Sequence, residues 1–253
     1  MIILLLYQHN LRNSHVVKYF IFQAFSSVVL IISLSKDLIF NDVLLLVAII
    51  KLGAAPFHIW FIGIVEKISL SHFFWIAVAQ KIIPFRLIQI LALPRLTFSK
   101  ILLISVLLAS LHIITQFKFI KILAASSIYI TPWILFCFFV SDLISWIFFL
   151  AYAFLQALTL GIFFKIKGKA DPLNYKRGGI SYLIRLLLII IMAGFPPRPL
   201  FFIKLSLLVY LFLAKLRVFA VVLILIARIS IFNYLNVISI RVIIRTRYHI
   251  MRL

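Results

Sequence analysis

The chain has 253 residues, of which 66% are hydrophobic and only 12% charged, and its mean hydropathy is +1.24. A soluble domain is about half apolar and about a quarter charged, so this composition excludes a soluble enzyme, a disordered chain and a disulfide scaffold. The 26 Lys and Arg residues outnumber the 5 Asp and Glu residues, which gives a net charge of +21. In membrane proteins such cations gather in untranslocated loops, so we interpret the charge as a membrane signature and expect no nucleic-acid partner.

Eight apolar stretches in chain order predict eight transmembrane helices, because a helix needs about 20 apolar residues to cross the hydrocarbon layer. The stretches are 16–34, 43–65, 70–92, 99–117, 121–141, 143–164, 180–213 and 216–240. We therefore expect an all-α fold, a polytopic membrane helix bundle. The first residues carry no basic region before an apolar run, so we expect no cleaved signal or transit peptide.

The basic residues are unevenly distributed between the loops of this topology. They are concentrated in alternate loops, around residues 118–121, 165–177 and 241–252, and are sparse in the intervening ones. The positive-inside rule then places both termini on the inner side of the membrane, which agrees with an even number of spans.

Helix-breaking residues interrupt two of the predicted helices, the second and the seventh. They are Gly53, Pro56, Gly194, Pro196 and Pro197. A proline lacks the backbone N–H and clashes with the carbonyl one turn earlier. Inside a membrane the freed backbone groups need protein or water as partners, so we expect two broken helices that line a protein interior or a hydrated cavity.

Three lysines, Lys51, Lys81 and Lys204, lie deep in predicted helices and close to a break or a proline. A cation at mid-membrane costs about 2.5–3.5 kcal/mol on insertion scales, so we expect all three to face the protein interior at similar depth. Burial favours the neutral amine, and a lysine can therefore release and regain a proton near neutral pH, which arginine cannot. We interpret the lysines as titrating sites of a proton path, with His58 as a relay.

The alternative for His58 is a hydrogen-bonded histidine at a helix interface. His72 and His112 stand alone near span ends, and we expect both to form local hydrogen bonds. Ser126 and Ser127 are expected to cap the start of the fifth helix. The sequence has no Gly-rich nucleotide loop, no Cys cluster and no spaced His pair within a helix. We therefore expect no catalytic residue, cofactor, metal or redox chemistry in this chain.

The segment Lys51-Leu-Gly-Ala-Ala-Pro-Phe-His-Ile-Trp60 resembles the lysine-bearing broken helix of subunit 2 of mitochondrial NADH:ubiquinone oxidoreductase, respiratory complex I. Four further motifs resemble the same family in the same order along the chain. They are Lys18-Tyr-Phe with Gln23, Gln80-Lys81 with Pro84, Lys121-Ile-Leu-Ala-Ala-Ser-Ser-Ile128, and Gly194-Phe-Pro-Pro with Lys204. The collinear set extends over about residues 18–240.

The resemblance implies an antiporter-like fold of inverted five-helix repeats, each with one broken helix. Residues 1–95 would be the remainder of the first repeat, with three helices, and residues 96–253 the second repeat with a basic C-terminal tail. It implies a proton-pumping subunit of the mitochondrial inner membrane, with lipids and other membrane subunits of complex I as partners and both termini on the matrix side. The alternatives are a structural subunit without translocation and a cation/proton antiporter subunit.

The resemblance also implies helices before Lys18, one of them with a buried glutamate paired with the equivalent of Lys51. The residues before Lys18 contain no acid. Asp42 precedes Lys51 by nine residues, about 13 Å of helix rise, and Glu66 lies beyond the break. We expect a separate polypeptide to supply the first helices and the acid; the alternative is that this segment has been lost and Lys51 is neutral or hydrated.

Overall fold

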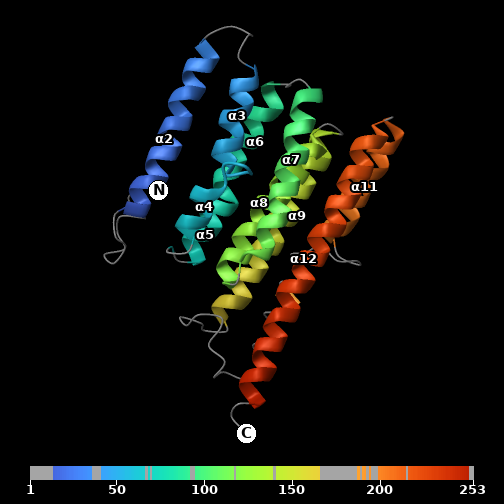
Figure 1. The fold of residues 1–253 in the computed structure, drawn as a ribbon. Coiled ribbons are helices and arrows are strands. Elements are labelled where there is room, and N and C mark those ends of the chain that lie inside the picture. Colours follow the sequence, from blue (N-terminus) through green and yellow to red (C-terminus); the bar gives the residue numbers. More distant parts are fainter. Residues whose placement is uncertain are drawn as a thin grey trace.

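Helices form the described part of the chain, and they lie side by side in one bundle (Figure 1). The computed structural model describes residues 14–35, 41–65, 68, 70–91, 95–116, 118–138, 141–165, 187, 188, 190, 191, 194, 199–214 and 216–250. The helices are α2 (Ser14–Ser35), α3 (Asn41–Leu52), α4 (Ile59–Val65), α5 (Leu70–Ala77), η1 (Ala79–Lys81), α6 (Ile82–Leu91), α7 (Arg95–Ile114), α8 (Phe119–Cys137), α9 (Asp142–Lys165), α11 (Pro199–Leu213) and α12 (Arg217–Ile250). Since no strand occurs among these residues, the predicted all-α class is confirmed.

Several of these helices are long and apolar enough to cross a membrane. Within the described ranges four stretches meet both criteria, His72–Ile90, Phe119–Cys137, Asp142–Ile162 and Arg217–Ile240. Shorter apolar helices cover Tyr19–Ile32, Ser99–Ile114 and Leu200–Leu213. The chain is therefore a multi-pass membrane helix bundle. The count of eight spans, and the division into repeats at residue 95, remain predictions.

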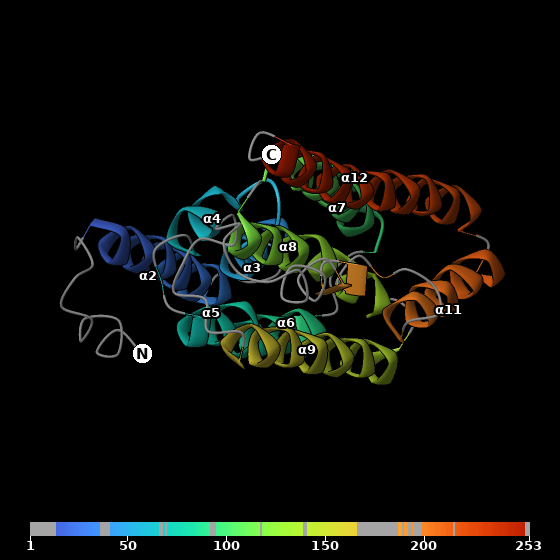
Figure 2. The ribbon, with the colours of Figure 1, turned by 90° about the horizontal axis from the view of Figure 1, so that it is seen from below.

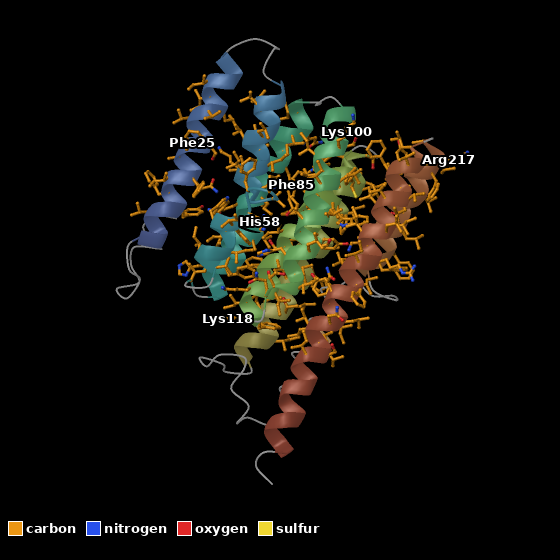
Figure 3. The ribbon with its side chains drawn as sticks, in the orientation of Figure 1. Phe25, His58, Phe85, Lys100, Lys118 and Arg217 are labelled. Carbon is orange, nitrogen blue, oxygen red and sulfur yellow. The ribbon has the colours of Figure 1, made fainter. Side chains whose placement is uncertain are left out.

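The two ends of the bundle carry the basic residues that the loop pattern assigned to opposite sides. Helix α2 begins, and α12 ends, at the lower end of the bundle in Figure 1. Lys118 lies at that lower end, whereas Lys100 and Arg217 lie at the upper end (Figure 3). The alternation predicted from the sequence is thus present, and the assignment of the lower end to the inner side remains a prediction.

Helix α8 lies in the middle of the bundle. Seen from below, α7 and α12 lie on one side of it, and α9 with α5 and α6 on the other (Figure 2). Every side chain from Ile122 to Cys137 is buried, including the three with aliphatic hydroxyls, Ser126, Ser127 and Thr131. A membrane helix places polar side chains toward other helices rather than lipid, so α8 carries the polar interior of this bundle.

The first predicted break lies between α3 and α4, and Gly53 is where α3 stops. The Gly53 backbone has φ +62°, and its N–H donates to the Ile50 carbonyl at 3.1 Å. The Ala54 N–H donates to the Ile49 carbonyl, also at 3.1 Å. Together these bonds form a Schellman motif, which satisfies the last carbonyls of α3 and requires the left-handed conformation that glycine adopts most easily.

Gly194 repeats this conformation before α11. It has φ +72°, and its N–H donates to the Ile191 carbonyl at 3.3 Å. Pro196 and Pro197 lie outside the described residues, so the second predicted break is described only through Gly194 and the start of α11 at Pro199. Proline at a first helical position is favourable because its missing N–H would have no partner there.

The single helix predicted over 70–92 is interrupted, which the sequence analysis did not anticipate. Helix α5 ends at Ala77, the short 3₁₀ segment η1 follows, and α6 begins at Ile82. Pro84 explains the position of the interruption, since it has no N–H to donate to the Gln80 carbonyl. The helix is therefore disturbed one turn before the proline, where Lys81 stands.

Replacing Gly53 with Ala is expected to destabilise the break. A left-handed residue with a side chain costs about 1–2 kcal/mol, and the new Cβ would lie 3.2 Å from Trp60 Cζ2. The matched control is Gly63→Ala in α4, because a Cβ there meets nothing within 4 Å. Thermal denaturation of the assembled protein should show a lower midpoint for Gly53→Ala alone. Equal midpoints for the two variants would contradict the role assigned to Gly53.

Candidate functional site

Lys81 points into α8 from the interrupted helix. Its side chain is only 3% exposed, and its Nζ donates to the Ser127 carbonyl and the Ser127 Oγ, both at 3.0 Å, and to Thr131 Oγ1 at 2.6 Å. Thr131 Oγ1 in turn donates to the Ser127 carbonyl at 2.7 Å. Three oxygen acceptors match the three N–H donors of an ammonium, so this site can hold a protonated lysine without a carboxylate.

Aromatic rings complete the surroundings of Lys81. Its Nζ lies 5.9 Å from the ring centroid of Phe61 and 5.8 Å from that of Tyr152. Ring faces attract a cation and are poorly hydrated, so they stabilise the ammonium and also exclude bulk water. On its other side, η1 is joined to α2 through the hydrogen bond that Gln80 donates to the Tyr19 hydroxyl.

Lys204, on α11, lies against a different part of α8. Its side chain is 8% exposed, and its Nζ lies 4.7 Å from the ring centroid of Tyr129 and 5.0 Å from that of Trp133. The Tyr129 hydroxyl accepts a hydrogen bond from Ser230 Oγ of α12 at 2.8 Å. A Cβ built on Gly194 would lie 3.5 Å from the lysine Nζ, so the glycine before α11 leaves room for the amine.

The two lysines contact opposite faces of α8. Ser127 and Thr131 are four residues apart and share the face toward Lys81, and Tyr129 and Trp133 share the face toward Lys204. A shift of two residues turns an α-helix by about 200°, so the two pairs point in nearly opposite directions. A single buried helix therefore separates the two titratable groups.

Further buried polar groups lie on the helices around α8. The hydroxyls of Tyr152 and Tyr234 and the Gln156 amide are buried without a hydrogen-bond partner among the described residues. Polar groups buried in proteins are usually hydrogen-bonded, and ordered water is the common partner where no protein group serves. The interior next to α8 and α9 thus offers several sites for water beside the lysines.

Lys51 is less enclosed than the other two lysines. It lies in the last turn of α3, immediately before the break at Gly53, and is half-buried. Asp142 is the only carboxylate whose side chain the structure describes, and it is exposed at the start of α9. No ion pair to Lys51 therefore occurs among the described side chains.

His58 lies in the break between α3 and α4, immediately before α4 begins at Ile59. Its side chain is 8% exposed, and its Nδ1 has no hydrogen-bond partner among the described residues. Its ring contacts that of His112 on α7, with ring centroids 4.7 Å apart and ring planes at 73°. The sequence analysis treated His112 as locally bonded, and it does lie 2.9 Å from Gln116 through their Nε2 atoms, but its contact with His58 was missed.

The expected capping role of Ser126 and Ser127 is wrong. Helix α8 begins at Phe119, a full two turns earlier, with Lys118 at the N-cap position and no side-chain cap. The Ser126 hydroxyl donates to the Leu123 carbonyl at 2.8 Å within the helix, and the Ser127 hydroxyl accepts from Lys81. Residues 119–125 form two helical turns ahead of the point at which the serines suggested a start.

The described residues contain no group of three or more His, Cys, Asp or Glu side chains that could hold a metal ion. Within those residues Cys137 is a free, buried thiol in α8. The site around α8 is built from amines, hydroxyls and imidazoles, which are groups that can exchange protons.

Apolar helices, a central helix with buried hydroxyls, and buried lysines beside interrupted helices define a polytopic membrane protein with a polar interior. The chain belongs to the family described as NADH:quinone oxidoreductase/Mrp antiporter, TM, whose profile matches residues 35–230.

The relatives agree with this assignment. The chain is 29% identical over 202 residues to NADH-ubiquinone oxidoreductase chain 2 of Anopheles gambiae, covering 74% of this chain and 59% of that one. It is 28% identical over 250 residues to the protein of the same name from Myxine glutinosa, covering 90% and 71%. The chain thus spans less than two thirds of the length of the mosquito relative.

Two solved structures share the fold. A chain of respiratory complex I from Thermus thermophilus with bound aureothin superposes with a TM-score of 0.72 at 17% identity, over 88% of this chain and 58% of that chain. A chain of the Mrp complex from Dietzia sp. DQ12-45-1b gives the same TM-score and identity, over 88% and 50%. The antiporter-like fold predicted from the motifs is confirmed.

Proposed function

We propose that this chain is a membrane-arm subunit of a proton-pumping NADH:ubiquinone oxidoreductase in the mitochondrial inner membrane. The observation that carries the proposal is the enclosure of Lys81 by oxygen acceptors of α8, with Lys204 on the opposite face of the same helix. The family match and the animal relatives named as chain 2 support the assignment to that complex rather than to an antiporter. In this proposal other subunits of the complex perform the redox chemistry.

The lysines act as sites that bind and release protons in turn. Lys81 gains a proton when the oxygens of Ser127 and Thr131 can accept its three N–H bonds. It loses the proton when charge elsewhere in the complex makes an ammonium unfavourable, because a lysine away from bulk water is readily neutralised. The buried hydroxyls of Tyr152 and Tyr234 offer positions for water that would join the sites.

Association with the oxidoreductase is tested by purifying the tagged chain from its own membranes and identifying the proteins that remain bound. The proposal expects NADH-oxidising subunits in stoichiometric amounts. A stable complex that contains only antiporter subunits would overturn the assignment and favour the cation/proton antiporter alternative. If the chain assembles with the oxidoreductase but replacing Lys81 leaves proton pumping unchanged, the result would favour a structural subunit instead.

We also propose that a carboxylate from a neighbouring polypeptide faces Lys51 in the assembled complex. An ammonium buried without a partner is costly, and a carboxylate within about 4–6 Å is the usual remedy. Among the described side chains no acid serves this purpose, since Asp142 is exposed. A structure of the whole complex should show a Glu or Asp of another segment beside Lys51. Lipid or an unrelated apolar helix in that place would contradict the proposal.

A further inference from the structure

His58 and His112 bring together two segments that are far apart in the chain. His58 belongs to the break between α3 and α4, and His112 to the last turn of α7, and their rings meet edge to face with centroids 4.7 Å apart. His58 lies between the upper end marked by Lys100 and the lower end marked by Lys118 (Figure 3). Two imidazoles this close can exchange a proton through one bridging water, because each has one nitrogen that accepts and one that donates.

Polar groups continue from His112 toward the surface of the bundle. His112 is half-buried, and the Gln116 Nε2 lies 2.9 Å from its Nε2. The same amide nitrogen donates to Thr115 Oγ1 at 2.8 Å, and Thr115 is exposed in the turn that leads to Lys118. The amide N–H can donate to His112 Nε2 only in the tautomer that carries its proton on Nδ1. A continuous set of polar side chains therefore runs from buried His58 to the α7–α8 turn.

We propose that His58 and His112 form a two-imidazole relay that carries protons between the α7–α8 turn and the break at Gly53. The relay extends the proposed function, on which it rests, and identifies His112 as a further proton-transferring residue. In each transfer an N–H bond on one ring breaks as its proton passes to a bridging water, and an O–H bond of that water breaks as an N–H bond forms on the other ring. Each ring is then reset at its second nitrogen by water, and on the outer side this water takes the place of the Gln116 amide at His112 Nε2.

The charges near the pair favour transfer over storage of protons. Lys121 of α8 is close enough to His112 to act on it electrostatically, and its ammonium has the same sign as an imidazolium. From α12 the neighbouring polar contact is uncharged, since Asn233 donates to the Ser110 carbonyl of α7 at 2.7 Å. Two protonated rings beside an ammonium would repel one another, so the pair holds one extra proton at most and passes it on.

The relay is tested with His112→Gln and His112→Ala in the assembled complex. Glutamine keeps a hydrogen bond to Gln116 but cannot titrate, so the relay predicts that both variants slow coupled NADH oxidation by about tenfold. Added imidazole should restore the rate of His112→Ala, because the position opens toward the surface. The matched control is His72→Ala, which replaces a half-buried histidine of α5 and should show neither the defect nor a response to imidazole.

The relay is overturned if the His112→Gln complex oxidises NADH as fast as the wild-type complex, since hydrogen bonding alone would then account for the role of His112. It is also overturned if added imidazole does not raise the rate of NADH oxidation by a fully assembled His112→Ala complex. In both cases a defect in Lys81→Met would leave the proposed function standing. If Lys81→Met also behaves like the unchanged complex, the proposed function fails independently of the relay.

Discussion

Replacing Lys81 with Met is expected to slow coupled NADH oxidation by on the order of 10²-fold, the contribution typical of a positioned proton-transfer group. Met keeps the length and apolar stem of the side chain but removes the amine that donates to Ser127 and Thr131. The three oxygens would lose their donor while the surrounding helices stay packed. The measurement is steady-state NADH:ubiquinone oxidoreductase activity per assembled complex.

Lys100→Met is the matched control for Lys81→Met. Lys100 is exposed on α7 at the upper end of the bundle, so its loss should leave turnover unchanged. Comparable activity of the two variants, at equal amounts of assembled complex, would show that Lys81 takes no part in the coupled reaction.

Replacing Lys204 with Met is the second change with a large expected effect. The amine lies over Tyr129 and Trp133, and removing it deprives the second face of α8 of its titratable group. Turnover should fall by an amount similar to that in Lys81→Met, about 10²-fold. If the two lysines act in series, the double variant should be no slower than either single variant, because residues that act as a unit are not additive.

Arg217→Gln is the control for Lys204→Met. Arg217 is exposed at the start of α12 and makes no contact with α8 that the described structure records. Unchanged turnover is expected for this control. A Lys204→Met complex that matches the control would remove Lys204 from the proposed proton path and leave Lys81, which faces α8 from η1, in that path.

The first break was predictable from the sequence because its chemistry is local. Glycine and proline close together signal a helix end wherever they occur, and Gly53 forms a Schellman motif from backbone bonds of α3 alone. The burial of Lys81 and Lys204 likewise follows from cost, since a cation in the hydrocarbon layer needs a protein interior. Neither argument depends on which helices are neighbours.

The features that sequence analysis missed depend on packing or on small local distortions. The contact of His58 with His112 joins segments more than fifty residues apart, and no periodic pattern in either segment signals it. The interruption at η1 was missed although Pro84 lies inside the helix predicted over 70–92, because an interior proline shows that a helix is disturbed but not whether it bends or breaks. Serines such as Ser126 mark helix starts in water, whereas in a membrane helix they also bond within the helix or to a neighbour.

The opposite placement of the lysines around α8 also required the structure. The motifs predict that both lysines belong to one proton path. The contacts add that Ser127 and Thr131 face Lys81, whereas Tyr129 and Trp133 face Lys204. A proton that moves between the lysines must therefore pass around or along α8, in which every side chain from Ile122 to Cys137 is buried. The hydroxyls on α8, α9 and α12 are the groups available for that passage.

The most direct test of the account is the number of protons moved per NADH oxidised by the complex reconstituted in sealed vesicles. Initial rates of acidification and of NADH oxidation would be recorded together for the unchanged complex and for Lys81→Met and Lys100→Met. The account predicts that residual turnover of Lys81→Met moves fewer protons per NADH, while Lys100→Met keeps the full ratio. A Lys81→Met complex that is fully assembled, active and pumps at the unchanged ratio would contradict the claim that this chain carries a proton path.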